Sequence, residues 1–202
     1  MNTIWDSRFS TEHYQYGKNP NEFLKRNLDS LPKGKILICA AGEGRDAIYA
    51  AKLGWEVIAF DQSVVGREKA LALAKENKVE ITYLIGDALT IELNESSFDA
   101  IASIFLHLPP ELRTKFHQRA INWLKPNGVF ILEGFSKNQL GNNSGGPKDL
   151  DWLFSKEELA EDFSSLSNVK INYETRILDE GPLHQGNAEL VHLVKREELI
   201  NN

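Results

Sequence analysis

The residues best suited to chemistry lie within the stretch Lys35–Asp61. Gly42 and Gly44 begin a loop that fits the pattern G-x-G-x-x-[GA], which Ala47 completes, and Asp61 follows about 20 residues after the loop begins. Glycines let the backbone approach a ligand closely, and a carboxylate can accept hydrogen bonds from both hydroxyls of a ribose. The spacing therefore predicts a nucleoside-binding site with Asp61 as the ribose ligand. A cap for the next helix is the alternative role for this carboxylate.

The charges of the glycine loop bear on which nucleoside binds. By spacing alone the loop would suit a dinucleotide, whose pyrophosphate binds at a helix N-terminus among neutral or basic neighbours. Glu43 lies inside the loop and Asp46 enters the first helical turn, and both carboxylates would repel a phosphate. S-Adenosylmethionine carries no phosphate, and its sulfonium and ammonium groups tolerate acidic neighbours. The charges therefore favour this cofactor.

Further polar residues follow the second and third predicted strands. Gln62 and Ser63 come directly after Asp61 and add polar groups to the same rim. Asp87 ends the third strand and precedes Ala88. Because the adenine edge offers an N6 donor and an N1 acceptor, a carboxylate and the next backbone N–H would satisfy both. We therefore predict an adenine contact at Asp87 and Ala88.

Alternating strand and helix patterns predict the elements that must position these residues. Short apolar runs are typical of buried parallel strands, and apolar residues three and four apart are typical of helices. We expect strands over residues 36–40, 56–60, 79–85, 98–105 and 129–135. We expect helices over residues 20–31, 47–53, 64–76 and 109–124, with Ala70, Leu71, Leu73 and Ala74 facing inward from the third. Strands separated by helices imply a parallel sheet, which binds ligands at the carboxyl ends of its strands.

The remaining segments are less regular. Residues 1–19 combine aromatic and polar side chains, which predicts an ordered arm of poor helical character that packs on the body. Residues 125–128 predict a turn, and residues 136–150 predict a long functional loop. A capping box of Ser155 and Glu158 predicts a last helix. Two strands over 170–178 and 188–195 predict a C-terminal antiparallel hairpin.

Length, charge and composition restrict the class of protein. A chain of 202 residues is long enough for one substantial core, and its net charge of −6 argues against a nucleic-acid partner. The single cysteine, Cys39, excludes an internal disulfide and fits a reducing cytoplasm. No apolar run has the ~20 residues of a membrane span, and no Cys or His spacing is typical of a metal site. We expect a cytoplasmic protein without a metal, a monomer or weak dimer, whose partner is a small molecule.

Four segments give the chain a resemblance to a known family. They are the loop at residues 42–46 (GEGRD), the entry segments 5–9 (WDSRF) and 16–20 (YGKNP), and the late segment 180–186 (EGPLHQG). The chain resembles a class I S-adenosylmethionine-dependent methyltransferase, and more narrowly the bacterial tellurite-resistance and thiopurine methyltransferase-like group.

This resemblance implies a fold and a cofactor. The fold is α/β and Rossmann-like, with a seven-stranded, mostly parallel sheet that ends in the antiparallel hairpin and helices on both faces. It implies one domain over residues 1–202, in which residues 1–32 form a lid and residues 33–202 form the core. The implied cofactor is S-adenosyl-L-methionine, and S-adenosyl-L-homocysteine is its product.

The chain departs from the family pattern within the first motif. Ile38 stands where an acidic residue usually supports the methionine ammonium, and Ala40 stands where a glycine is usual. Both residues would weaken cofactor binding or transfer the contacts elsewhere. Arg45 and the aromatic arm, which includes Trp5, are the candidates to replace those contacts.

The end of the fourth strand is where the family places the methyl group and its acceptor. The resemblance implies backbone contacts to the cofactor from Ile104 and Phe105. His107 and Tyr16 are the candidate catalytic residues: His107 as a general base, and Tyr16 by closing over the cofactor, since an aromatic face attracts a sulfonium. Packing is the alternative role for both side chains.

We predict a methyltransferase that acts on a small-molecule acceptor. A soft nucleophile, such as a thiol, selenium or tellurium species, needs little base catalysis, which agrees with the lack of an obvious base. A non-catalytic module that binds S-adenosylmethionine is one alternative, favoured by Ile38 and Ala40. A nicotinamide-dependent oxidoreductase is a second alternative, against which stands the absence of a Tyr-x-x-x-Lys pair.

Overall fold

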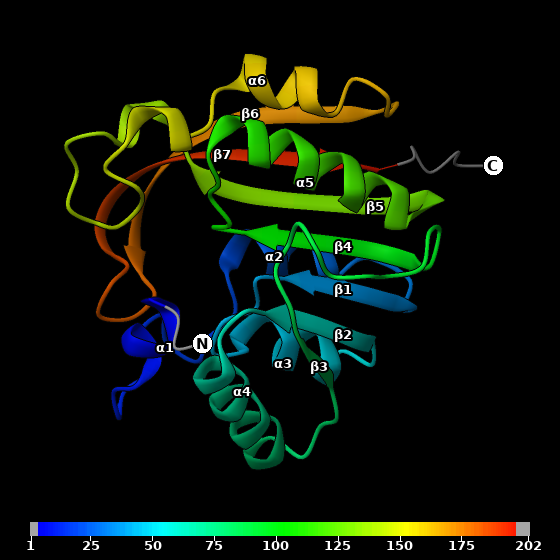
Figure 1. The fold of residues 1–202 in the computed structure, drawn as a ribbon, viewed down its shortest axis with the longest axis vertical. Coiled ribbons are helices and arrows are strands. Elements are labelled where there is room, and N and C mark those ends of the chain that lie inside the picture. Colours follow the sequence, from blue (N-terminus) through cyan, green and yellow to red (C-terminus); the bar gives the residue numbers. More distant parts are fainter. Residues whose placement is uncertain (1–3, 197–202) are drawn as a thin grey trace.

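The computed structural model describes residues 4–196, and Figure 1 shows their sheet flanked by helices. The strands are β1 (Lys35–Cys39), β2 (Glu56–Asp61), β3 (Thr82–Ile85), β4 (Phe98–Ile104), β5 (Leu124–Phe135), β6 (Val169–Asp179) and β7 (Gln185–Lys195). Their order across the sheet is β3-β2-β1-β4-β5-β7-β6. The strands β1 to β5 pair in parallel, whereas β7 is antiparallel to both β5 and β6. The predicted seven-stranded sheet with its C-terminal hairpin is therefore confirmed.

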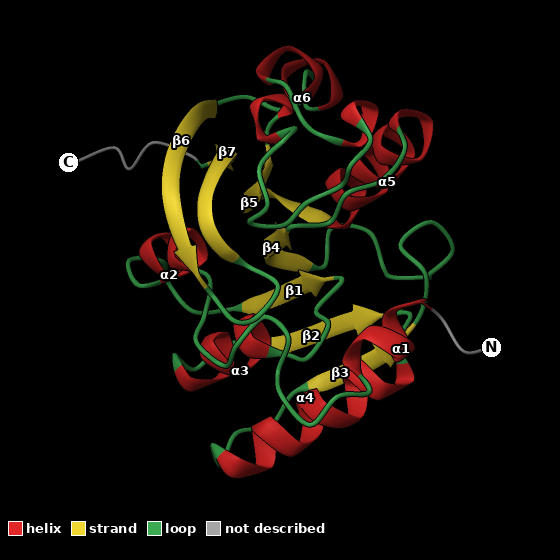
Figure 2. Cartoon of the chain, turned by 90° about the vertical axis from the view of Figure 1, so that its left-hand side faces the viewer, coloured by secondary structure: helices red, strands yellow, loops and turns green. Residues whose placement is uncertain are grey.

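Helices cover both faces of this sheet, as Figure 2 shows from a second direction. They are α1 (Ile4–Phe9), α2 (Glu22–Leu28), α3 (Arg45–Lys52), α4 (Val64–Glu76), α5 (Pro110–Trp123) and α6 (Lys156–Asp162). Two 3₁₀ turns, η1 (Lys137–Gln139) and η2 (Leu150–Trp152), lie within and after the predicted loop at 136–150. The capping box that begins α6 is present as predicted. None of the helices in residues 4–196 is long and apolar enough to cross a membrane.

Alternation along the strands divides the core into two layers. Ile36 and Ile38 of β1 pack with apolar residues of α2, α3 and α4 on one face. Leu37 and Cys39 pack with residues of α5 and α6 on the other face. Successive side chains of a strand point to opposite faces, so an apolar run such as that of β1 must be covered on both sides.

Several local predictions were wrong. Residues 4–9 form a helix, although the arm was expected to be poor helix material. Leu71 was expected to face inward, but its side chain is 36% exposed. The predicted turn at 125–128 lies within β5, where the register against β4 shifts between Phe98 and Ala100. The third strand begins at Thr82, so it is shorter than expected.

The arm that begins with α1 is attached to α4. Asp6 is buried, and its Oδ1 accepts hydrogen bonds from Ser63 Oγ at 2.7 Å and from the Val65 amide at 3.2 Å. Lys69 Nζ donates to three backbone carbonyls of the arm, those of residues 9, 11 and 13, at 3.2, 3.0 and 2.7 Å. The arm is therefore ordered by polar contacts with α4, as well as by its aromatic side chains.

A fully buried carboxylate joins the middle of the sheet to the C-terminal hairpin. Glu133 of β5 accepts hydrogen bonds from Asn21 Nδ2 at 2.6 Å and from Arg176 of β6 at 2.9 Å. His192 Nε2 of β7 lies 2.7 Å from its other oxygen. A buried charge is stable only when it is paired and hydrogen-bonded, so these partners from the N-cap of α2, from β6 and from β7 are part of the fold.

Candidate cofactor and acceptor site

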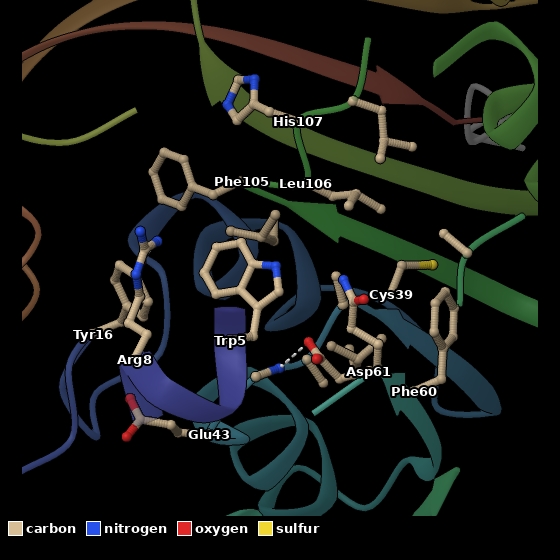
Figure 3. Close-up of a pocket in the computed structure, with 18 of the residues that line it drawn as sticks. Trp5, Arg8, Tyr16, Cys39, Glu43, Phe60, Asp61, Phe105, Leu106 and His107 are labelled. Atoms are coloured by element: carbon tan, nitrogen blue, oxygen red, sulfur yellow. Dashed lines mark hydrogen bonds between the residues drawn. The ribbon is translucent and has the colours of Figure 1, made fainter. Parts of the chain in front are cut away.

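A cavity of about 620 Å³ lies at the carboxyl ends of β1, β2 and β4 (Figure 3). The strands β2 and β4 lie on opposite sides of β1, so the strand order reverses direction at β1. Open α/β sheets bind ligands where the strand order reverses. The arm and residues 146–147 of the long loop complete the walls. Of the predicted site residues, those that line the cavity are Trp5, Tyr16, Ala40, Gly42, Gly44, Arg45, Asp61, Gln62, Asp87, Ala88, Ile104, Phe105 and His107.

The backbone after β1 turns through residues with a positive φ. These are Ala40 at 48°, Gly42 at 51° and Gly44 at 91°. A Cβ on Gly44 would lie 2.5 Å from the Cβ of Ala70, and a Cβ on Gly42 would lie 3.2 Å from Cζ of Phe9. Ala40 thus keeps the left-handed backbone despite its methyl group, at a cost of ~1–2 kcal/mol. The glycines make room for α4 and for the arm, in addition to any ligand.

Asp61 is buried at the end of β2, where it organises the turn. Its Oδ2 accepts a hydrogen bond from the Gly42 amide at 3.0 Å, and its Oδ1 accepts one from the Ser63 amide at 2.9 Å. Within residues 4–196 the carboxylate has backbone N–H donors and no ion-pair partner. Burial raises its pKa, because no cation offsets the loss of water. Each carboxylate oxygen has two lone pairs, so capacity remains on the side that faces the cavity.

The acidic residues of the loop have structural partners. Glu43 lies 2.5 Å from Lys69 Nζ, and its Oε2 accepts a hydrogen bond from the Gln15 amide at 2.6 Å. Asp46 accepts a hydrogen bond from the Asn21 amide at 2.7 Å, and burial raises its pKa. The two carboxylates therefore hold the arm and the start of α2. They also line the cavity, where they keep the loop unfavourable for a phosphate.

Arg45 has its guanidinium committed to protein partners. NH1 donates to the Tyr16 carbonyl at 2.9 Å, and NH2 donates to Glu180 Oε2 at 3.0 Å. Glu180 follows β6, and its pKa is lowered to about 2 by hydrogen bonding to His184 and by the charge of Arg45, despite its burial. Arg45 therefore connects α3 to the arm and to the hairpin.

His107 does not have the geometry of a general base. Its Nδ1 lies 2.9 Å from the Trp152 carbonyl, and its Nε2 accepts a hydrogen bond from the Phe135 amide at 3.1 Å. Those partners require a neutral ring with the proton on Nδ1. Burial lowers the pKa of His107 to about 4. Both nitrogens tie η2 to the end of β5, so this geometry disfavours His107 as a base, and its catalytic role stays a prediction.

Tyr16 contacts the side chains of the arm and of the hairpin. Its hydroxyl accepts a hydrogen bond from Arg8 NH1 at 3.1 Å. Its ring meets Phe9 and His184 edge to face, with centroids 6.3 and 4.5 Å apart. Burial raises the pKa of Tyr16, so the phenol stays protonated at neutral pH. Tyr16 is therefore positioned to cover the cavity, but not to remove a proton.

Two predicted cofactor ligands, Ser63 and Asp87, form hydrogen bonds within the protein. Ser63 lies outside the cavity wall, because its hydroxyl caps α4 by accepting from the Gly66 amide and donates to Asp6. Asp87 lies in the wall and is exposed, and its Oδ1 accepts a hydrogen bond from the Leu89 amide at 2.8 Å. Ser63 is thus a helix cap, whereas Asp87 keeps a second oxygen for a ligand.

Some wall residues were missed as site residues. Arg8 and Phe9 belong to α1, and Phe135 and Trp152 belong to the segments that follow α5; the wall also contains His184, from the turn after β6. The entry motif WDSRF and the late motif EGPLHQG contain Arg8 and His184, so these two had a signal in the sequence. Among the residues that the structure describes, no cluster of three or more His, Cys, Asp or Glu could hold a metal ion.

Comparison with known proteins agrees with this geometry. Residues 36–128 match a family described as a methyltransferase domain. An uncharacterized methyltransferase of Synechocystis is 33% identical over 128 residues, which cover 62% of this chain and 58% of that protein. A thiopurine S-methyltransferase of Legionella pneumophila is 22% identical over 163 residues, which cover 72% of this chain and 71% of that protein. The chain thus spans little more than half of the Synechocystis relative.

Solved structures show the same fold. One, from work on the conversion of a disulfide bond into a thioacetal group during echinomycin biosynthesis, has a TM-score of 0.74 at 15% identity and covers 98% of this chain and 92% of its own. TehB from Haemophilus influenzae has a TM-score of 0.72 at 15% identity and covers 96% of this chain and 66% of its own. The resemblance to class I S-adenosylmethionine-dependent methyltransferases is therefore confirmed, and this chain is related to them.

Proposed function

We propose that the protein binds S-adenosyl-L-methionine in this cavity and methylates a small molecule with a soft nucleophile. The observation that carries this proposal is Asp61, a buried carboxylate in the cavity wall that has no cation beside it among residues 4–196. Such a group is stabilised by hydrogen-bond donors, and the two hydroxyls of a ribose are suitable donors. Asp87 and Ala88, at the end of β3, supply the carboxylate and the backbone N–H for an adenine edge.

The bound cofactor would supply an electrophilic methyl group, which the acceptor takes by in-line displacement with loss of S-adenosyl-L-homocysteine. The protein would contribute orientation and exclusion of water, which are worth up to ~7–11 kcal/mol in favourable cases. Ile104 ends β4 in this wall, and Phe105, which follows it, has a φ of 55°. This left-handed turn directs the chain away from the sheet and opens the space beside the strand end.

Much of the cavity wall that follows the end of β4 is apolar. It contains Leu106, Leu108, Leu112, Phe135 and Trp152. An apolar wall disfavours a small metalloid oxyanion, because such an ion needs several donors to replace its water. It favours an apolar acceptor whose nucleophile reacts without proton removal by the protein, such as a thiol that is already ionised at neutral pH.

The arm and the long loop would act as lids over the bound molecules. Both contribute to the cavity wall, the arm through Trp5 and Tyr16 and the loop through Gly146 and Pro147. Gln139 holds the loop, because its Oε1 accepts from the Glu189 amide and its Nε2 donates to Ser144 Oγ, both at 2.9 Å. A lid excludes water and positions the acceptor.

A non-catalytic binding module is the second candidate, favoured by the committed nitrogens of His107 and by the left-handed Ala40. Calorimetric titration with S-adenosyl-L-homocysteine and with a nicotinamide dinucleotide tests the cofactor. We expect heat from the first ligand alone. Binding of the dinucleotide alone would overturn the proposal in favour of an oxidoreductase.

Methyl transfer is then measured with aromatic thiols, selenite, tellurite and small amines as acceptors. We expect transfer to the apolar thiols. Cofactor binding without transfer to any of these acceptors would favour the binding module. The small-molecule partner, the cytoplasmic location and the monomeric or weakly dimeric state stay predictions, the last of which sedimentation equilibrium would test.

A further inference from the structure

Two cationic side chains line the cavity within the described part of the chain, and they differ in their partners. Arg8 comes from α1 and Arg45 from the first turn of α3. Arg45 is buried and pairs with Glu180 at 3.0 Å. Arg8 is exposed and has no carboxylate partner among residues 4–196. Arg8 is therefore the cation that remains available to a ligand.

The guanidinium of Arg8 is held in place by neutral groups. Its NH1 donates to the Tyr16 hydroxyl at 3.1 Å, and its Cζ lies 4.5 Å from the ring centroid of Trp5. Figure 3 shows its side chain rising from α1 beside Tyr16, with the guanidinium directed toward the side of the cavity where Phe105 lies. A guanidinium has five N–H donors, so most of them stay free for an anion.

The charges of the wall indicate which anionic group needs this cation. S-Adenosylmethionine carries one anionic group, its α-carboxylate. Four carboxylates line the cavity, those of Glu43, Asp46, Asp61 and Asp87, and each would repel that group. Because Glu180 already occupies Arg45, we propose that Arg8 binds the α-carboxylate of the cofactor. This inference rests on the proposed function and deepens it.

The assignment makes α1 the element that recognises the amino-acid end of the cofactor. Arg8 would select a sulfonium nucleoside that has a carboxylate over one that lacks it. Of the two candidates that the sequence offered for the contacts missing from the first motif, Arg45 and the arm, this assignment selects the arm. The neutral contacts of Arg8 with Trp5 and Tyr16 orient the guanidinium before the ligand arrives, which lowers the entropic cost of binding.

The experiment compares two ligands that differ in that carboxylate alone, S-adenosylmethionine and decarboxylated S-adenosylmethionine. Their dissociation constants are measured by calorimetry on the whole chain, its Arg8→Gln and Arg8→Lys variants, and an Arg26→Gln control. Arg26 is an exposed arginine of α2 that pairs with Glu174 and does not line the cavity. Unfolding curves of each variant show whether the fold is retained.

For the unmodified chain we expect S-adenosylmethionine to bind at least about tenfold more tightly than its decarboxylated form, as a lost charge-assisted hydrogen bond predicts. Arg8→Gln should remove that preference by weakening the first ligand about tenfold and the second less than about twofold. Arg8→Lys should give an intermediate preference, since an ammonium keeps the charge without the bidentate geometry. Arg26→Gln should change neither constant.

Three results would overturn the assignment. One is equal affinity of the unmodified chain for the two ligands. Another is an equal loss for both ligands in Arg8→Gln, which would make Arg8 a structural residue of the arm. The third is absence of binding of both ligands and of S-adenosyl-L-homocysteine to the unmodified chain, and this result alone would also remove the proposed function.

Discussion

Asp61 and His107 both line the cavity, but they differ in how many of their hydrogen-bonding positions are left for a ligand. Asp61 accepts backbone N–H groups and keeps lone pairs for a ligand. His107 has a partner on each ring nitrogen, so nothing remains for an acceptor's proton. The role of each residue therefore follows from how many of its hydrogen-bonding positions the fold has already used.

Replacing Asp61 by Asn should weaken S-adenosyl-L-homocysteine binding by at least ~1 kcal/mol, because a charged hydrogen bond is lost. The amide oxygen of Asn can accept from the Gly42 amide, but its NH2 group would then face the Ser63 N–H, which is also a donor, so unfolding curves are needed to show how much of the turn after β1 persists. Calorimetry measures the change in affinity, and an unchanged dissociation constant would exclude Asp61 from the site.

Tyr83→Phe is the matched control for this change. The Tyr83 hydroxyl donates to the Gly42 carbonyl at 2.6 Å, and the residue lies outside the cavity wall. Its loss disturbs the same turn without removing a ribose contact. We expect lower stability with a smaller change in affinity than in Asp61→Asn, and an equal loss of affinity would mean that Asp61 acts through the turn alone.

Helices and strands could be predicted from the sequence where their burial produces a regular pattern of apolar residues. They were harder to predict where a contact with a distant part of the chain stabilises the element. The apolar run of residues 36–40 predicts β1 because both faces of that strand are covered. The helix α1 was missed because contacts with α4, through Asp6 and Lys69, hold its six residues in place. The partner of His107 is a carbonyl 45 residues later, which no local pattern around His107 indicates.

Lys69→Met should loosen the arm, because three carbonyls of residues 9–13 lose their shared donor. It should also leave Glu43 without its cation. We expect faster amide hydrogen exchange over residues 4–16, together with weaker cofactor binding if the arm acts as a lid.

Lys75→Met tests the same change of charge on the same helix. Lys75 is exposed in the last turn of α4 and follows Lys69 in the same helix. Exchange in the arm should match that of the unmodified chain. Equal exchange in Lys69→Met and in the unmodified chain would show that the aromatic contacts suffice to hold the arm.

The whole molecule combines one sheet with several ionisable side chains that are removed from water. Burial lowers the pKa of His107, to about 4, and also lowers the pKa values of His117 and His184. Each folded-state pKa lies below the ordinary histidine value of about 6.5, so the unfolded chain binds more protons as the pH falls through that value. The stability that these histidines contribute is present above about pH 6.5 and is lost toward the folded-state pKa.

The free energy of unfolding should therefore decrease from pH 7.5 to pH 5.5, by up to ~1.4 kcal/mol per pH unit for each histidine that titrates. Raised pKa values at Asp46 and Asp61 act in the opposite direction, so the test compares variants. His107→Gln should reduce the slope of the free energy of unfolding against pH, measured by urea unfolding. Equal slopes in His107→Gln and the unmodified chain would contradict the prediction.

The buried Glu133 has a consequence for the order in which the protein is made. Its carboxylate belongs to β5, but two of its partners, Arg176 and His192, are synthesised later, with the C-terminal hairpin. A nascent chain that ends before β6 has the glycine loop, Asp61 and the end of β4, but it lacks both Arg176 and His192, so Asn21 is the partner of the Glu133 carboxylate that remains. We therefore expect the cofactor-binding half to become stable only after the last strands have been made, so a chain truncated before β6 should be less stable than the full chain.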